Sequence, residues 1–271
     1  MTQVWVNGQA MASVSPFDRG LAYGDGLFAT MRVGPEGIAF FDAHMQRLQQ
    51  GAARLGLDWH LSPELAALLH RLGAAHPHQC IKLVITRGVG GRGYAPPTPC
   101  HPTEIVSLHP IPEHYADWQR QGIRLCTSGV RLGRQPLLAG IKHLNRLEQV
   151  LIRSAVLPDG IDDWLVKDSH RLLISSSMGN LFFVRENQVF TPALTACGVA
   201  GVMRAQVIMA LADLGFNVIV ADLNEDFLHY ASHVFVTNSL FGIVDVLAID
   251  RVNYPRAQFT ASLRQTLALI L

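Results

Sequence analysis

The chain has 271 residues, of which 49% are hydrophobic and 16% are charged, and its formal net charge at pH 7 is +1. This composition is typical of a compact globular protein with two domains and excludes a disordered chain. A nearly neutral chain has no general electrostatic attraction for nucleic acid or anionic lipid, so neither a nucleic acid nor a membrane is expected as a partner.

Cysteine spacing and the apolar runs indicate the compartment. No apolar run approaches the roughly 20 residues that a bilayer-spanning helix needs. The N-terminus lacks the basic and apolar segments of a signal peptide. Cys80, Cys100, Cys126 and Cys197 are far apart and show no CxxC spacing. Free thiols in a reducing compartment are therefore expected, and the predicted location is the cytoplasm.

The first half of the chain predicts a strand-rich domain with two helices. Asp42 is the expected N-cap of a helix that runs to about Leu55. Ser62, followed by Pro63 at the first helical position, begins a second helix. Strands are expected at residues 4–6 and 9–14 around an Asn-Gly turn, and at 27–33, 37–41, 80–88 and 103–112.

The second half of the chain has short strands in meanders. Strands are expected at 123–130, 163–168, 171–175, 180–184 and 188–192, followed by a helix over 202–214, a strand at 217–222, a short helix, a strand at 233–238 and a C-terminal helix. This order predicts an α+β fold. The expected organisation is a smaller N-terminal α/β domain over 1–112, a linker over 113–121, and a larger strand-rich domain over 122–271.

Lys142 is the only cation in the apolar run LLAGIK (137–142), and His143, Asn145, Arg146 and Glu148 follow just behind it. A nucleophilic lysine must be neutral, yet an unperturbed lysine is neutral only about once in 2,500 at pH 7. Burial among Leu137, Leu138, Ile141 and Leu144 would disfavour the charged form, and a covalent bond to an aldehyde would solve the same problem. An ordinary lysine with an exposed amine remains the alternative.

Two glycine-rich segments are candidates for binding anions. Gly198 and Gly201 precede a predicted helix, where unpaired N–H groups favour a phosphate, although a plain loop-to-helix junction has the same pattern. Residues 87–94 (RGVGGRGY) do not match a phosphate loop. They combine arginines and a tyrosine with a flexible backbone, which suits a carboxylate as well as an ordinary hairpin tip.

Other chemistries find little support in the sequence. His76, His78 and Cys80 have no fourth ligand at matching spacing, so no metal is expected. The serines of SSSMG (175–179) lack the GxSxG frame of a serine hydrolase.

Six segments resemble, in order, the fold-type IV pyridoxal-phosphate enzymes. They are DRGLAYGDGLF (18–28), HMQRL (44–48), TRGVGGRGY (86–94), AGIKHLNRLEQ (139–149), GNLFFV (179–184) and GVAGVMR (198–204). This family holds branched-chain and D-amino-acid aminotransferases and 4-amino-4-deoxychorismate lyases. The segment RLGRQPLLAGIKHLNRLEQVLIR is most similar to the lyases.

The resemblance implies pyridoxal 5'-phosphate as the cofactor and assigns residues to it. Lys142 matches the lysine that bonds to the cofactor and later moves the proton. The residues that match the phosphate side are Arg47, the backbone around Val199 and Ala200, Asn238 and Ser239. Arg92 and Tyr94 match a loop that traps a substrate carboxylate across a dimer interface in the D-amino-acid enzymes, so a homodimer is expected.

Two positions depart from the aminotransferases of the family. Ser175 stands where the family has a glutamate that pairs with the pyridine nitrogen of the cofactor, and a neutral hydroxyl gives a weaker electron sink. Phe28 stands where D-amino-acid aminotransferases carry a tyrosine. Both favour a lyase that converts 4-amino-4-deoxychorismate to 4-aminobenzoate and pyruvate in folate biosynthesis. The alternatives are an aminotransferase of the same fold or a low-activity relative that binds the cofactor.

Overall fold

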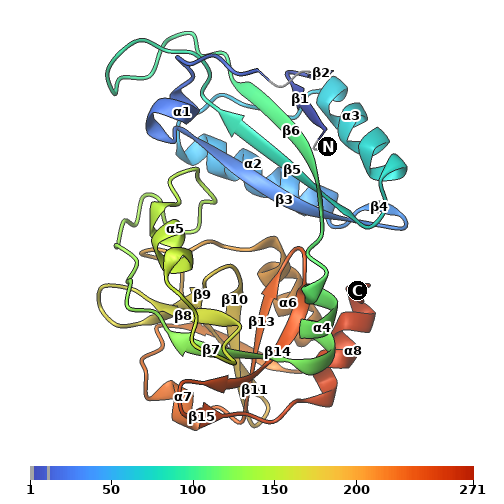
Figure 1. Ribbon diagram of the computed structural model, residues 1–271, viewed down its shortest axis with the longest axis vertical. Coiled ribbons are helices and arrows are strands. Elements are labelled where there is room, and N and C mark those ends of the chain that lie inside the picture. The colour runs from blue at the N-terminus through green and yellow to red at the C-terminus, as the bar shows by residue number, and fades with distance from the viewer. Residues whose placement is uncertain (1–2, 11–12) are drawn as a thin grey trace. The chain divides into compact units, whose positions relative to one another are not determined.

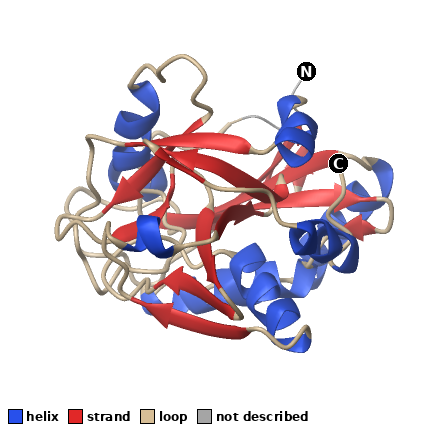
Figure 2. Ribbon diagram, turned by 90° about the horizontal axis from the view of Figure 1, so that it is seen from below, coloured by secondary structure: helices blue, strands red, loops and turns tan. Residues whose placement is uncertain are grey.

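The computed structural model describes residues 3–10 and 13–271. The chain divides into two compact units. Unit 1 comprises Met1–Pro112 and Ile141–Asn145, and unit 2 comprises Glu113–Gly140 and Arg146–Leu271. Strands and helices alternate irregularly along both units, which confirms the predicted α+β class (Figure 2). Within the described ranges, no helix is both long and apolar enough to cross a membrane.

Unit 1 is built on one antiparallel sheet with the strand order β2-β1-β6-β5-β3-β4 (Figure 1). Its strands are β1 (Val4–Val6), β2 (Gln9–Ala10), β3 (Gly26–Gly34), β4 (Gly37–Ile38), β5 (Gln79–Thr86) and β6 (Thr103–Pro110). Its helices are α1 (Arg19–Tyr23), α2 (Phe41–Arg54) and α3 (Pro63–Ala75). The predicted Asn-Gly hairpin is β1–β2, and residues 11–12 of its second strand lie outside the described residues.

Alternation along the strands decides which face of this sheet is the core. Successive side chains of a strand point to opposite faces, so every second residue of β3 lies on one face. The residues on the core face are all buried: Leu27, Ala29, Met31 and Val33. They join apolar residues of α2, α3, β5 and β6 in one core cluster, so both helices cover the same face. The other face receives Phe28 and Thr30, opposite Val84 and Lys82 of β5.

The two long helices of unit 1 begin differently. Ser62 caps α3 as predicted, and its hydroxyl accepts a hydrogen bond from the Leu65 amide at 3.1 Å. Helix α2 begins at Phe41, one residue before the predicted N-cap, and its cap is Phe40 in a left-handed conformation (φ 53°). Asp42 lies in the first turn, where its negative carboxylate interacts favourably with the positive end of the helix dipole.

Residues 141–145 extend the sheet of unit 1 at the edge of β3. The Phe28 amide donates to the Lys142 carbonyl at 3.0 Å, and the Leu144 amide donates to the Gly26 carbonyl at 2.9 Å. Leu27 and His143 form an antiparallel bridge between these bonds. The backbone of Lys142 therefore belongs to unit 1, although the sequence placed it in the C-terminal domain.

Unit 2 contains a larger sheet with the order β12-β11-β10-β13-β14-β7-β8-β9. Strand β9 pairs with both β8 and β10, which closes part of the sheet into a ring. Its strands are β7 (Ile123–Thr127), β8 (Asp163–Lys167), β9 (Leu173–Ser176), β10 (Asn180–Arg185), β11 (Gln188–Pro192), β12 (Asn217–Ala221), β13 (His233–Asn238), β14 (Gly242–Ile249) and β15 (Val252–Asn253). Its helices are α4 (His114–Gln121), α5 (Leu147–Ser154), α6 (Val202–Asp213), α7 (Phe227–Tyr230) and α8 (Gln258–Thr266).

The segment expected to be a linker, residues 113–121, contains α4 and belongs to unit 2. Tyr115 and Gln119, one turn apart on this helix, are buried. The Gln119 amide donates to the carbonyls of Phe241 and Leu269. These partners are more than 100 residues away, and a reading of local composition does not find them.

Candidate active site

Lys142 lies beside Phe28 in unit 1. Its Nζ is 4.5 Å from the centroid of the Phe28 ring, a distance at which an ammonium is attracted to an aromatic face. Both side chains are half-buried. Of the apolar neighbours expected from sequence, Ile141 is buried and Leu144 half-buried, whereas Leu137 is 78% exposed.

A second amine, which the sequence reasoning missed, lies near the same ring. Lys82 on β5 has its Nζ 5.4 Å from the Phe28 centroid. Lys82 pairs with Thr30 and Val84 pairs with Phe28, so strand alternation places these four side chains on one face of the sheet. The register of β3 and β5 would have placed Lys82 beside Phe28, but the sequence does not show which strands pair. This face of unit 1 therefore presents two cationic groups around an aromatic ring.

Helix α2 adds His44 and Arg47, one turn apart. His44 is 1% exposed, and its Nδ1 has no hydrogen-bond partner among the described residues. Burial, together with the charges of Arg47 and Lys142, lowers the pKa of His44 to about 3. His44 therefore stays neutral at physiological pH, within electrostatic reach of both cations.

Arg47 is a strong candidate for holding an anion. Its Nε is buried and has no hydrogen-bond partner in the described part of the chain. Burial lowers the pKa of Arg47 to about 10, so the guanidinium is still charged at neutral pH. A buried charged donor without a partner is costly, and a bound phosphate or carboxylate would satisfy it.

In unit 2, the turn at Val199 and Ala200 leads into α6. The Gly140 amide donates to the Gly198 carbonyl and the Ala200 amide donates back to the Gly140 carbonyl, both at 3.0 Å. The Ala200 amide therefore already has a partner. The N–H groups of the first turn of α6, which begins at Val202 after the cap Gly201, have no acceptor within the helix. These amides are better placed for an anion than that of Ala200.

Asn180 on β10 fixes this turn, and the sequence reasoning gave it no role. Its Nδ2 donates to the Val199 carbonyl at 3.0 Å. A Cβ added at Gly201 would lie 2.3 Å from the Asn180 Oδ1, so only glycine fits there without a shift. Asn180 stands in the segment GNLFFV, but the contact spans 19 residues and depends on the fold.

Ser175 lies directly across the sheet from Asn180. It is half-buried on β9 and is followed by a tight turn, in which the Ser176 hydroxyl accepts the Gly179 amide at 2.9 Å. The next serine, Ser177, donates through its hydroxyl to the buried carboxyl of Asp163. Burial raises the pKa of Asp163, against the hydrogen bond from Ser177.

Asn238 is the last residue of β13, and Ser239 follows it. The Asn238 Nδ2 donates to the Met178 carbonyl at 3.2 Å, so Asn238 contacts the turn that follows Ser175. Its Oδ1 accepts the amides of Leu240 and Phe241, both at 2.9 Å. Asn238 therefore shapes the turn that contains the half-buried Ser239.

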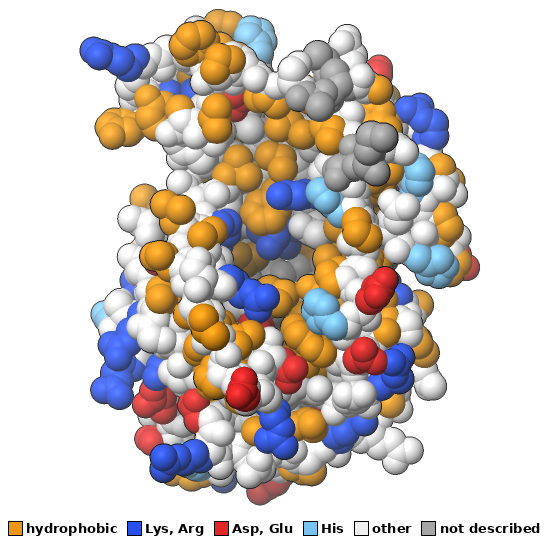
Figure 3. Space-filling view, in the orientation of Figure 1, with side chains coloured by type: hydrophobic (Ala, Val, Ile, Leu, Met, Phe, Trp, Pro, Cys, Tyr) orange, Lys and Arg blue, Asp and Glu red, His pale blue; other side chains and the backbone are white. Residues whose placement is uncertain are grey.

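Arg92 and Tyr94 are exposed on the glycine-rich loop of unit 1, and Tyr94 is 86% exposed. Thus unit 1 holds Lys142, Phe28 and Arg47 together with this loop. Unit 2 gathers Ser175, Val199, Ala200, Asn238 and Ser239 around Asn180 and the turn after β9. On the face of unit 2 that Figure 3 shows, acidic and basic side chains are intermixed.

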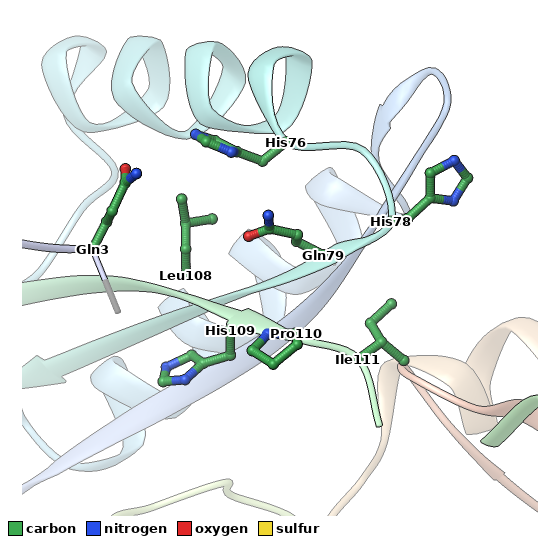
Figure 4. Close-up of a pocket in the computed structure, with 8 residues that line it drawn as sticks. All are labelled: Gln3, His76, His78, Gln79, Leu108, His109, Pro110 and Ile111. Carbon is green, nitrogen blue, oxygen red and sulfur yellow. The ribbon is translucent and has the colours of Figure 1, made fainter. Parts of the chain in front are cut away.

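A separate pocket of about 450 Å³ lies at one end of the unit 1 sheet and contains none of the residues discussed so far as candidates for cofactor or substrate binding. His76, His78 and His109 line it, but their imidazoles are well apart (Figure 4). Within residues 3–10 and 13–271, no group of three His, Cys, Asp or Glu side chains is arranged to hold a metal ion.

Comparison with known proteins places the chain in a family. Residues 26–249 match the family described as amino-transferase class IV. The chain is 36% identical to an aminodeoxychorismate lyase of Vibrio harveyi over 97% of this chain and 98% of the relative. The chain therefore belongs to the class IV aminotransferase family.

Solved structures agree with this assignment. A 4-amino-4-deoxychorismate lyase from Pseudomonas aeruginosa superimposes with a TM-score of 0.90 at 39% identity, covering 99% of this chain and 100% of that one. A hypothetical aminotransferase from Mycobacterium tuberculosis, solved in a PLP-bound form, shares the fold with a TM-score of 0.83 at 18% identity, covering 99% and 98% of the two chains.

Proposed function

We propose that this protein is a pyridoxal-phosphate-dependent lyase that converts 4-amino-4-deoxychorismate to 4-aminobenzoate and pyruvate, a step in folate biosynthesis. The observation that carries the proposal is the similarity to the Vibrio harveyi lyase over nearly the full length of both chains. The similarity to the Pseudomonas aeruginosa lyase supports the same reaction.

The residues of both units suit this cofactor. Lys142 offers an amine to the aldehyde, and Arg47 offers a guanidinium with an unsatisfied buried Nε to the phosphate. The first-turn amides of α6, after Val199 and Ala200, also suit a phosphate. We also assign Ser175, Asn238 and Ser239 to the cofactor site. When bound, the cofactor withdraws electrons from the carbon that bears the substrate amine, which makes its hydrogen acidic.

Lys142 is the proposed catalytic base. It would hold the cofactor in the resting enzyme, and its Nζ accepts the proton from the amine-bearing ring carbon of the substrate. The electron pair of that C–H bond enters the ring, the C–O bond to the side chain breaks, and the ring becomes aromatic. The side chain leaves as enolpyruvate, which takes up a proton to become pyruvate. Phe28 packs against the lysine and supplies no hydroxyl that could compete for this proton.

An aminotransferase is the second candidate, because the matching family is named for that reaction. The serine at position 175 disfavours this reaction. Transamination needs a long-lived carbanion and so depends on a charged partner for the pyridine nitrogen, which a serine hydroxyl does not provide. Elimination is driven by aromatisation and tolerates the weaker electron sink.

One assay separates the two reactions. Purified holoenzyme is incubated with 4-amino-4-deoxychorismate alone, and separately with 2-oxoglutarate and branched-chain or D-amino acids. The lyase proposal expects 4-aminobenzoate and pyruvate in the first reaction and little keto acid in the second. Rapid transamination without 4-aminobenzoate would refute it.

We also propose that the protein is a homodimer, in which Arg92 and Tyr94 of one subunit bind the carboxylate of the substrate in the active site of the other subunit. In unit 1, Phe17, Leu21, Val89 and Tyr94 are exposed, and in unit 2 the exposed apolar side chains include Leu137, Leu147, Val150, Leu151 and Val156. Exposed apolar side chains favour association where they form a contiguous patch.

Mixing two variants that are each nearly inactive at a substrate concentration well below KM tests the shared site. If loops cross between subunits, Lys142→Ala and Arg92→Ala together recover about a quarter of wild-type activity, because half of randomly assorted dimers are mixed and each mixed dimer has one complete site. If each loop serves its own subunit, mixing recovers nothing.

The cytoplasm is the proposed location. All four cysteines, Cys80, Cys100, Cys126 and Cys197, are free thiols, which suits a reducing compartment.

A further inference from the structure

The glycine-rich loop that carries Arg92 and Tyr94 is exposed, yet its base is held by the N-cap and first residue of α1. The Arg19 amide donates to the Gly88 carbonyl at 2.9 Å, and Asp18 bridges Val89. Gly88 has a φ of 83°, and a Cβ there would lie 1.8 Å from the His101 carbonyl oxygen. The backbone conformation of the loop is therefore restricted where it leaves β5.

The side chain of Arg19 holds the far end of the loop. Arg19 is 4% exposed although its guanidinium contacts a surface loop. Its Nη1 donates to the Gly93 carbonyl at 2.9 Å and to the Ala95 carbonyl at 3.4 Å. Its Nη2 donates to the Tyr94 carbonyl at 2.8 Å. One planar group thus fixes three successive peptide units, immediately after Arg92.

Tyr23 supports the same peptides from a second side. Its hydroxyl accepts the Gly93 amide at 3.1 Å, and its ring lies 4.8 Å from the Arg19 guanidinium carbon. The rings of Tyr23 and Tyr94 are 5.5 Å apart. Tyr94 is therefore directed by both its backbone and its ring.

Asp25 orients Arg19 and connects it to α2. Its Oδ2 accepts the Nε of Arg19 and the Nε of Arg87, both at 2.8 Å. Burial raises the pKa of Asp25, but the hydrogen bonds from Arg87 and Arg19 outweigh it and hold that pKa below its usual range. Arg87 in turn donates to the carbonyls of Leu55 and Gly56, just after α2, both at 2.8 Å. The helix that bears Arg47 and the loop that bears Arg92 thus share one buried charge network.

We propose that Arg19 is a positioning residue that holds the 93–95 backbone so that Arg92 and Tyr94 meet an anionic substrate in a fixed geometry. The inference rests on the proposed function of that loop. A loop held in its binding conformation loses less entropy when the substrate binds. Arg19 therefore acts on substrate affinity and leaves proton transfer at Lys142 unchanged.

Arg19→Lys is the first variant, because it keeps the charge but cannot span three carbonyls with one ammonium. Trypsin cleavage after Arg92 reports the loop without any activity assay. Loss of one or two charge-assisted hydrogen bonds should speed this cleavage about tenfold, since cleavage follows the population of the open loop. Arg264→Lys is the matched control, because Arg264 is 8% exposed and donates to the Ile243 carbonyl in unit 2.

Kinetics then show whether the held loop serves the substrate. Arg19→Lys should raise KM for 4-amino-4-deoxychorismate about tenfold, with kcat and cofactor absorbance nearly unchanged. In an Arg92→Ala background the same substitution should change KM less than about twofold, because the side chain that it positions is gone. Additive effects in the double variant would overturn the inference, as would a fall in kcat at constant KM.

Tyr23→Phe keeps the inference testable if Arg19→Lys does not fold. It removes only the acceptor of the Gly93 amide and should speed cleavage after Arg92 about threefold. Unchanged cleavage in a folded Arg19→Lys or Tyr23→Phe protein would overturn the inference. A wild-type protein without lyase activity would overturn the proposed function instead, and cleavage after Arg92 distinguishes the two failures.

Discussion

Ser175 on β9 and Asn180 on β10 are direct partners across the sheet, so their side chains point to the same face. The Asn180 amide holds the Val199 carbonyl of the proposed phosphate turn. Ser175, which stands where the family has a glutamate, is therefore one strand away from Asn180, which holds the proposed phosphate turn. A change at either residue should be visible in the spectrum of the bound cofactor.

Ser175→Glu should convert part of the activity to transamination. A carboxylate at this position would stabilise a protonated pyridine nitrogen, so we expect a gain of about tenfold or more in transamination. The lyase rate should change little. Both rates are measured on the holoenzyme, with Ser154→Glu on the exposed end of α5 as the control. No change in either reaction would remove Ser175 from the cofactor site.

Asn180→Ala should weaken cofactor binding about tenfold, because the Val199 carbonyl loses its donor. Gly201→Ala should also weaken it, because the new Cβ would lie 2.3 Å from the Asn180 Oδ1. In the Asn180→Ala background that clash is absent, so Gly201→Ala should cost less there than in the wild type. Titration of the apoenzyme with pyridoxal phosphate gives the four dissociation constants, for the wild type, each single variant and the double variant. Equal costs in both backgrounds would contradict the contact.

His44 should make the fold sensitive to mild acid. Its pKa is about 3 in the folded protein, against 6.5 for an ordinary histidine side chain. Between these values the unfolded chain binds the proton and the folded chain does not, so stability falls as pH falls below 6.5. From pH 6.5 to 5 the loss amounts to roughly 2 kcal/mol.

His44→Gln removes this proton and should flatten the fall in the free energy of unfolding over that pH range. Urea denaturation at several pH values measures it. His60→Gln is the control, because the His60 side chain is 84% exposed. An unchanged pH slope in His44→Gln would show that His44 is not buried and neutral.

Lys82→Met should raise KM for the anionic substrate. The variant keeps an apolar stem near Phe28 but removes one of the two amines on that face. We expect KM to rise about three- to tenfold at low salt and by less at high salt, because the lost attraction is electrostatic and screened. A KM that does not change at any salt concentration would place Lys82 outside the substrate site.

Local signals in the sequence were sufficient for several elements and failed for others. The cap of α3 was predictable because Ser62 and Pro63 act within four residues. The start of α2 was not, because Phe40 adopts a left-handed conformation without a glycine. Strand β14 was missed because Asp245 interrupts its apolar run. That carboxylate is buried against the Thr260 hydroxyl of α8, which lies 15 residues away.

The residues proposed to bind the cofactor and substrate were predicted from the resemblance to the family. The residues that hold them in place, Arg19 and Asn180, were not predicted. Arg19 reaches carbonyls 74 to 76 residues away, and Asn180 reaches one 19 residues away. Both are polar side chains whose partners are backbone carbonyls, and a backbone carbonyl leaves no trace in the sequence. Such positions emerge only when the fold is known.

The most direct test of the proposed function is the product ratio from 4-amino-4-deoxychorismate. Wild-type holoenzyme without an amino acceptor should release 4-aminobenzoate and pyruvate in equal amounts, and Lys142→Ala should release neither above background. Absence of 4-aminobenzoate from wild-type protein with bound cofactor, or equal product release by Lys142→Ala, would contradict the proposed lyase mechanism.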